Sequence, residues 1–165
     1  VGAQGTDIGS AAEIARDGSH KCRAVRLSQI GEGAFRPGEW SAATSFACAR
    51  PDFFVSHSWR DDPDHKYLAL LLIARRFEEE HGYEPTFWID KYCIEQSSIS
   101  ESLRYLPVYL TACNMVIIFM GPSYLSRLWC VWELFIIHST RTLEELICWS
   151  IAPFTLSDDL PNASA

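Results

Sequence analysis

Glu133 is the residue whose neighbours in the sequence most directly suggest chemistry. It is the only acidic residue in residues 123–140, a run that the sequence predicts to be helical. The residues three and four positions away are aromatic, aliphatic or cysteine, so none can form a salt bridge with it. Trp129 lies one turn earlier on the same helical face. A flat indole beside a lone carboxylate suits a planar, cationic or sugar-linked ligand.

This helix is apolar nearly all round, which predicts an element that is largely buried. A carboxylate in such a helix lies at a solvent-filled edge or carries a desolvation cost. Cys130 and Trp132 are expected to pack in the core, and for Trp129 core packing competes with a ligand role. For Glu133 itself, the competing interpretation is a carboxylate at a solvent edge with no chemical role.

Composition limits the class of protein. The chain has 165 residues, 48% of them hydrophobic, which fits one globular domain with a real core. A net charge of −7 with few lysines argues against a nucleic-acid binder. No signal-peptide pattern or bilayer-length apolar run is found, so we expect a cytoplasmic protein without a membrane partner. Six widely spaced cysteines with no CxxC pair predict free thiols.

Alternation of strands and helices predicts the fold class. Short apolar strands are expected at 52–56, 86–90, 115–120 and 143–151. Helices are expected at 63–80, 98–113 and 123–140. This order predicts an α/β fold with a parallel sheet and helices on both sides. Ligands bind such sheets outside the carboxyl ends of the strands.

Three segments are predicted along the chain. Residues 1–50 form an N-terminal extension, partly flexible because its first part is rich in Gly, Ala and Ser, with a strand expected within 21–30. Residues 51–151 form the domain, and residues 152–165 form a tail. The loop from 91 to 98 is expected to border the ligand crevice.

Local signals define two of the helices in more detail. Asp62 is expected to cap the first helix and Gly82 to end it. We expect Pro107 to kink or split the second. The residues of the first helix expected to face inward are Leu68, Leu71, Leu72 and Phe77.

Several catalytic classes are excluded by missing motifs. The sequence has no GxGxxG, no GxxxxGK[ST], no GxSxG and no histidine cluster with metal-ligand spacing. No metal and no cofactor are therefore expected. His57 and Ser58 are adjacent, so their side chains point apart, and a nucleophile–base pair is disfavoured. Lys91 is expected to be a solvated charge or to face a ligand phosphate.

Three stretches resemble Toll/interleukin receptor (TIR) domains. Residues 53–58 (FFVSHS) resemble the first strand and turn of that family, and residues 88–90 (WID) resemble its second strand. Residues 123–134 (SYLSRLWCVWEL) closely resemble the SxxYxxSxWCxxEL signature of plant-type TIR domains. Residues 88–96 (WIDKYCIEQ) also resemble the WIDxxCIxQ motif of fungal HET domains. The resemblance covers about residues 52–150.

The resemblance implies a flavodoxin-like three-layer α/β/α fold with a central parallel sheet. It implies NAD+ glycohydrolase activity, with NAD+ as a substrate, in immune or cell-death signalling, and homo-oligomers formed through TIR–TIR contacts. Glu133 matches the catalytic glutamate of the WCxxE segment. Together with the reasoning about strand ends, the expected substrate-binding residues are Trp129, Ser56, His57, Ser58, Trp59, Arg60, Asp90, Lys91 and Gly121.

The reaction chemistry fits one carboxylate. The nicotinamide of NAD+ is already a cationic leaving group, so no general acid is needed, unlike ordinary glycoside hydrolysis. One carboxylate suffices to hold the ribose and stabilise an oxocarbenium-like centre. The product is ADP-ribose or a cyclic isomer. The alternative is a non-catalytic TIR-like module that acts by homotypic assembly, and a deoxyribosyltransferase-like reaction is a distant third.

The sequence departs from the TIR pattern in two places. Ser97 stands near the position where a glycine is usual in the loop after the second strand. The fifth strand and last helix of a TIR domain have no evident counterpart. Either the sequence is truncated, or residues 21–30 supply another strand.

Overall fold

The computed structural model describes residues 20–36, 44–94 and 99–151, together with positions 13, 18 and 38. The strands are β1 (Arg23–Arg26), β2 (Phe46–Ala47), β3 (Phe53–His57), β4 (Thr86–Trp88), β5 (Met115–Met120) and β6 (Leu146–Ser150). The α-helices are α2 (Pro63–His81), α3 (Asp90–Cys93), α4 (Ile99–Ala112) and α5 (Leu128–Thr140). Short 3-10 helices are η1 (Leu27–Gln29), η2 (Glu32–Phe35), η5 (Tyr124–Ser126) and η6 (Leu143–Glu145).

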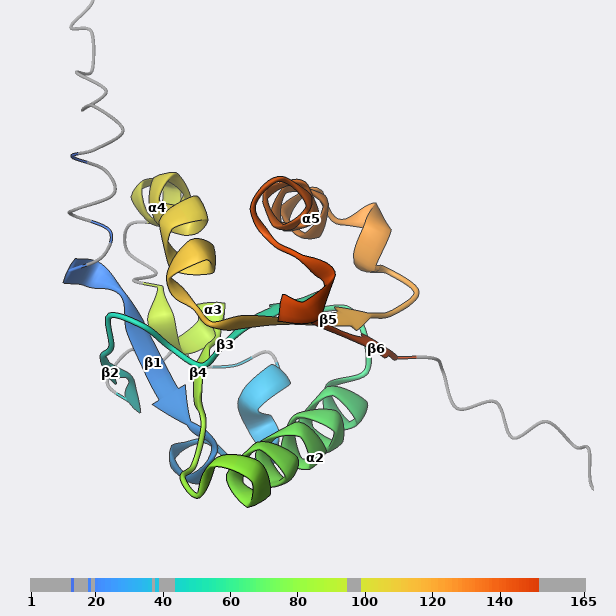
Figure 1. Ribbon diagram of the computed structural model, residues 1–165. Helices are drawn as coiled ribbons and strands as arrows, with labels where there is room; N and C mark the ends of the chain where they lie inside the picture. Colours follow the sequence, from blue (N-terminus) through green and yellow to red (C-terminus); the bar gives the residue numbers. More distant parts are fainter. Residues whose placement is uncertain are drawn as a thin grey trace, which may run out of the picture.

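The six strands form one mixed sheet in the order β2-β1-β4-β3-β5-β6. Strands β4, β3, β5 and β6 run parallel to one another. Strand β1 pairs antiparallel with β4, and β2 pairs antiparallel with β1. Helix α2 covers one face of the sheet, and α4 and α5 cover the other (Figure 1). The predicted α/β class and all four predicted parallel strands are confirmed.

The sheet includes strands from both sides of residue 51, the predicted boundary between the N-terminal extension and the domain. Strand β1 comes from the 21–30 segment, and Val25 pairs with Phe87 of β4. Of the two alternatives, a truncated sequence or another strand from residues 21–30, the structure shows the strand. It lies antiparallel beside β4, on the side of the sheet away from β6.

Strands β3 and β5 form the centre of the core. All five residues of β3 are buried, and so are the four inner residues of β5. Their parallel register runs from Phe53 opposite Met115 to His57 opposite Phe119. A strand buried on both faces needs a continuous apolar sequence, which both strands largely have. The exceptions, Ser56 and His57, lie at the carboxyl end of β3, where the ligand site is expected.

Helix α2 begins and ends as predicted but turns a different face inward. Asp62 Oδ1 accepts hydrogen bonds from the first turn, and Gly82 closes the helix with a φ of 79°. The leucines predicted to face inward, Leu68, Leu71 and Leu72, are instead 55, 37 and 55% exposed. The buried face consists of Lys66, Ala69, Leu70, Ile73 and Ala74. Both faces of α2 carry apolar residues, so spacing alone did not select the inner one.

Two other helices were given specific expectations. Helix α4 runs through Pro107 as one element, so of the two expected effects of this proline the split does not occur. Helix α5 is not buried all round, because Leu128, Trp132 and Phe135 are 86, 45 and 61% exposed. The prediction that Trp132 packs in the core is therefore wrong, whereas Cys130 is buried as expected. Of the predicted loop at 91–98, the first three residues belong to α3, and residues 95–98 lie outside the described residues.

The orientation of α2 makes a direct stability prediction. Leu70→Ala removes a fully buried side chain and leaves a cavity, so we expect the free energy of unfolding to fall by about 2–5 kcal/mol. Leu72→Ala, on the exposed face, is the matched control and should change it by about 0.5 kcal/mol or less. Chemical denaturation measures both variants. Equal losses would contradict this orientation.

Candidate functional site

Polar side chains gather where the parallel strands end. Nine polar or charged residues in the described part of the chain are buried, and most of them belong to this region. Ser56 and His57 close β3, and Asp90 begins α3 directly after β4. Gly121 follows β5 and leads through η5 into α5. The carboxyl ends of parallel strands meet at one edge, so segments far apart in sequence converge here.

Glu133 is held inside this region. Its side chain comes from the second turn of α5, and the residue is only 2% exposed. Ser56 Oγ donates a hydrogen bond to Glu133 Oε2, and Trp129 Nε1 donates one to Oε1. Ser56 Oγ also lies 2.5 Å from the Tyr124 hydroxyl oxygen. A chain of three hydrogen bonds thus links η5, β3 and α5 through the carboxyl group.

Burial decides the protonation state of this carboxyl. Removal from water raises the pKa of Glu133 to about 8, and the negative charge of Asp90 adds to the rise. The hydrogen bonds from Ser56 and Trp129 act in the opposite direction but do not cancel it. Glu133 is therefore mostly neutral at pH 7. The sequence left two interpretations of this carboxyl, a position at a solvent edge and a desolvated position. The structure shows the desolvated position.

A second group of predicted residues surrounds Asp90. Trp59 Nε1 donates to Asp90 Oδ2 at 2.8 Å, and the Lys91 backbone N–H donates to Oδ1 at 2.7 Å. His57 Nε2 lies 3.4 Å from Asp90 Oδ1, and the His57 and Trp59 rings meet edge to face at 4.5 Å. His57 is 4% exposed, and neither ring nitrogen makes a hydrogen bond within the described residues. His57 thus packs beneath the loop and does not pair with Ser58.

The loop after β3 is fixed by a buried lysine. Lys66 is fully buried, and its Nζ donates to the Ser58 carbonyl at 2.7 Å. It also lies over the Phe35 and Trp59 rings, 5.4 and 6.0 Å from their centroids. Burial lowers the pKa of Lys66 to about 8, and the charge of Asp61 limits this fall. A charged group buried this deeply is retained where it fixes a backbone.

Asp61 ties the same loop to the end of β5. Its Oδ1 accepts a hydrogen bond from the Ser123 backbone N–H at 2.9 Å. Ser58 and Ser123 are further joined through their hydroxyls at 2.6 Å. Gly121 allows this approach, because a Cβ on it would lie 2.2 Å from Asp61 Oδ2. Gly121 therefore makes room for a loop contact at the position where substrate binding was predicted.

Two predicted residues are not part of this group. Lys91 is 7% exposed, and its Nζ donates to the carbonyls of Gly33 and Arg36 at 3.1 and 3.0 Å. The prediction of a solvated or phosphate-facing Lys91 is wrong, because the 3-10 turn at Gly33 covers it and its ammonium satisfies that turn. Arg60 is exposed, and within the described residues its guanidinium makes no hydrogen bond or ion pair.

Sequence reasoning missed several residues that build the site. Lys66, Asp61 and Tyr124 received no role, although all three are buried. For Lys66 a signal was present: it is the only charged residue in the helical stripe that continues through Leu70 and Ile73. Nothing local in the sequence marks Asp61, because its hydrogen-bond partner, Ser123, comes after β5 and is distant in sequence.

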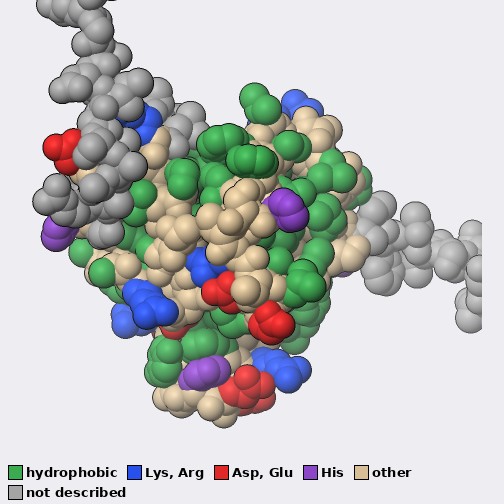
Figure 2. Space-filling model, turned by 45° about the horizontal axis from the view of Figure 1, so that its top comes forward, with side chains coloured by type: hydrophobic (Ala, Val, Ile, Leu, Met, Phe, Trp, Pro, Cys, Tyr) green, Lys and Arg blue, Asp and Glu red, His purple; other side chains and the backbone are tan. Residues whose placement is uncertain are grey.

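Trp129, the residue that hydrogen-bonds Glu133, also lines a pocket between α4 and α5. The pocket has a volume of about 460 Å³ and is lined by Arg104 of α4 and by Leu128, Trp129 and Trp132 of α5. Figure 2, which is turned so that the α4 and α5 side comes forward, shows hydrophobic side chains gathered at the surface there.

Within the described residues, no three His, Cys, Asp or Glu side chains lie close enough together to hold a metal ion. All six cysteines are free thiols, as predicted, and burial raises the pKa of the Cys130 thiol to about 12. Among the helices that the structure describes, none has both the length and the apolar character needed to cross a bilayer.

Comparison with known proteins returns no match: no protein-family model, no curated protein and no solved structure is significantly similar to this chain.

The raised pKa of Glu133 predicts how stability depends on pH. The unfolded chain releases this proton near pH 4.5, but the folded chain keeps it to about pH 8. The free energy of unfolding of the wild type therefore falls as pH rises through this window. Glu133→Gln stays uncharged throughout, so its stability relative to the wild type should rise by roughly 1–4 kcal/mol across the window.

Denaturant unfolding at a series of pH values measures this difference. Glu144→Gln is the control: the Glu144 carboxylate is exposed and its pKa is lowered, so its effect lies below the window. Stability curves for the wild type and Glu133→Gln that run parallel from pH 4.5 to 8 would show that Glu133 does not retain its proton.

Proposed function

We propose that this protein is a NAD+ nucleosidase of TIR type with Glu133 as its catalytic residue. The observation that carries the proposal is the buried Glu133 carboxyl at the carboxyl ends of the parallel strands, bonded to the half-buried Trp129 indole. Trp129 also lines an open pocket. A raised pKa in such a place is typical of functional carboxyls. The resemblance of residues 123–134 to the TIR signature supplies the substrate.

Strand order supports the finer assignment of fold. The parallel strands, numbered along the chain, lie in the order second, first, third, fourth. This is the beginning of the flavodoxin order 2-1-3-4-5, in which ligands bind where the first and third strands diverge. Here these are β3 and β5, and Ser56 and Gly121 lie at their carboxyl ends. We therefore propose a flavodoxin-like, TIR-like fold in which antiparallel β1 and β2 extend the opposite edge.

The proposed reaction breaks the bond between C1′ of the ribose and the nicotinamide nitrogen. Nicotinamide leaves with the electron pair and becomes neutral, so no proton donor is required. The Glu133 carboxylate stabilises the positive charge that develops at C1′. Water then adds to C1′ and releases a proton, which gives ADP-ribose, or an internal hydroxyl adds to give a cyclic isomer.

Two features of the resting structure must change for this reaction. Glu133 has to ionise, and the Trp129 N–H that occupies Oε1 has to move aside. A cationic pyridinium placed next to Glu133 favours both, because an adjacent positive charge lowers the pKa of a carboxyl. Asp90 adds negative charge nearby, which also favours a cationic ligand. Trp129 is then free to stack on the pyridinium ring.

The test is nicotinamide release from NAD+ at high protein concentration. Glu133→Gln should lower the rate by roughly 100-fold or more, because a neutral amide does not stabilise the charge at C1′. Below about pH 8 the kcat/KM of the wild type should rise roughly tenfold per pH unit and then level off, as Glu133 ionises.

Glu144→Gln is the control, because it removes one negative charge from an exposed side chain, and it should leave the rate of nicotinamide release unchanged. Circular dichroism should show that Glu133→Gln is folded. Equal rates of nicotinamide release from the wild type and Glu133→Gln would sink the catalytic assignment.

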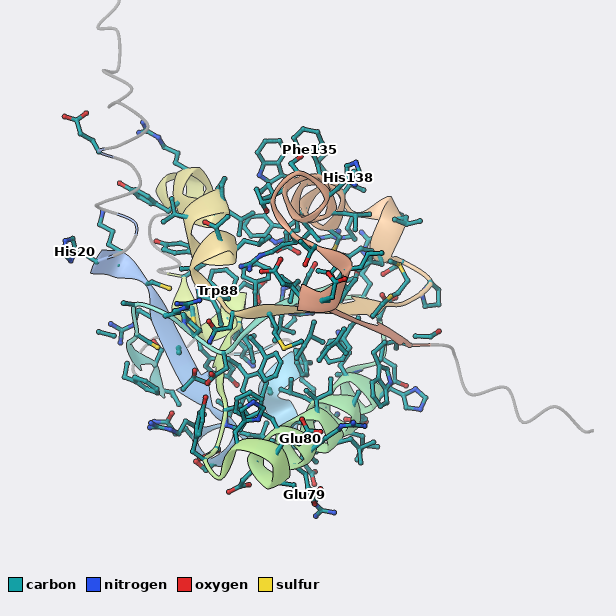
Figure 3. All side chains as sticks on the ribbon, in the orientation of Figure 1. His20, Glu79, Glu80, Trp88, Phe135 and His138 are labelled. Carbon is teal, nitrogen blue, oxygen red and sulfur yellow. The ribbon has the colours of Figure 1, made fainter. Side chains whose placement is uncertain are left out.

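One observation favours the alternative of homotypic assembly. The exposed face of α5 carries a strip of large apolar side chains, formed by Leu128, Val131, Trp132 and Phe135, and Leu125 of η5 is exposed as well. Phe135 points away from the sheet on the outer side of the helix (Figure 3). Contiguous apolar patches of this kind mark interaction surfaces more often than free surface. Assembly and catalysis are compatible, since an assembly can order a catalytic site.

Phe135→Glu tests this role of the strip. Phe135 is 61% exposed, so the substitution should leave the fold intact. A charge there should abolish self-association through α5, because it would have to be desolvated in the contact. Sedimentation velocity over a range of concentrations measures the change. Leu143→Glu, which changes a leucine outside the strip that is 84% exposed, is the control. Self-association that survives Phe135→Glu would assign assembly to another surface.

A further inference from the structure

The pocket between α4 and α5 is lined by Trp129 but not by Glu133. Trp129 forms the wall between them: its indole lines the pocket, and its N–H is bonded to Glu133 on the inner side. The pocket surface is almost entirely apolar and open to solvent. Its volume of about 460 Å³ lies in the range of small-molecule sites.

Trp132 gives this pocket a flat aromatic surface. Its indole is 45% exposed, and it stacks on the Phe135 ring with centroids 5.8 Å apart and an interplanar angle of 17°. Leu128, which is 86% exposed, adds an aliphatic side chain one turn away. Indole and leucine surfaces together favour a planar, neutral ring system.

Arg104 lines the pocket through its aliphatic part, because the lining is almost entirely apolar, and its guanidinium brings positive charge to the rim. Its side chain is exposed, and among the described residues it has no hydrogen-bond or ion-pair partner. The first turn of α5, where Leu128 and Trp129 lie, contains no acidic residue and has no side-chain cap. The positive end of the helix dipole is therefore not neutralised there. A ligand suited to this pocket carries an anionic group next to its ring.

These features point away from a pyridinium cation in this pocket, because Arg104 would repel it. A neutral purine attached to phosphates fits both the aromatic wall and the guanidinium. We propose that the α4–α5 pocket binds the adenine base of an adenine nucleotide, with Arg104 contacting its phosphates. The identification with the adenosine end of NAD+ rests on the proposed function. Adenine and the reacting ribose then lie on opposite sides of Trp129.

Binding of ADP-ribose tests this site, because ADP-ribose has the base and both phosphates but no nicotinamide to release. Isothermal titration calorimetry on the full chain should show that Trp132→Ala raises the Kd roughly tenfold or more through loss of stacking. Arg104→Gln should raise it roughly fivefold, and less at high salt. Adenosine should depend on Trp132 but not on Arg104.

Matched controls separate the pocket from its surroundings. Val131→Ala truncates an exposed residue of the same helix outside the pocket, and Arg76→Gln removes an exposed arginine from α2. Neither should change the Kd of ADP-ribose. Trp132→Phe should restore much of the affinity that Trp132→Ala loses, because it restores an aromatic surface.

The outcomes distinguish this site from the proposed reaction. Glu133→Gln should still bind ADP-ribose. If the wild type releases no nicotinamide but binds ADP-ribose through Trp132 and Arg104, the proposed reaction is wrong and the nucleotide site stands. The site is overturned if the wild type does not bind ADP-ribose, or if Trp132→Ala leaves the Kd unchanged. Were Trp132→Ala to change only the sedimentation coefficient, the pocket would be part of a protein contact.

Discussion

The burial of one carboxyl group between β3 and α5 constrains the rest of this structure. Glu133 has to find hydrogen-bond donors inside the protein, because leaving a buried polar group unpaired costs about 1–3 kcal/mol. It finds one on its own helix, Trp129, and one on β3, Ser56. Tyr124 in turn lies against Ser56, so the turn that leads into α5 is fixed by the same chain. The position of α5 on the sheet follows from these contacts.

A second set of buried polar contacts makes the loop after β3 part of the core. Lys66 reaches from α2 to the Ser58 carbonyl, and Asp61 reaches across to the backbone after β5. The Lys66 ammonium also lies over the Trp59 ring, which meets the His57 ring edge to face. A loop held in this way presents its side chains in one arrangement. That arrangement suits a site that must align a substrate against a fixed carboxyl.

The proposed reaction gives a physical reason for keeping Glu133 neutral and covered. A buried ionised carboxylate without a cation is unstable, so the resting site holds a proton and an indole N–H. A cationic substrate supplies the missing charge itself, and the carboxylate forms where it is needed. In the same proposal, the exposed aromatic surface beyond Trp129 binds a nucleotide base, and the alternative is a contact with another protein. The neutral carboxyl and the apolar surface lie on different sides of one helix.

Local signals in the sequence determined the four parallel strands, the ends of α2 and the Glu133–Trp129 pair, because caps, apolar runs and helical spacing act within a few residues. Tertiary structure decided which helical faces turn inward. Helices α2 and α5 carry apolar residues on more than one face, so only packing against the sheet buried Lys66 and exposed Trp132. It also decided that Lys91 serves a turn near residue 33 and that Asp61 serves the end of β5. Those partners are distant in sequence, and no local pattern specifies them.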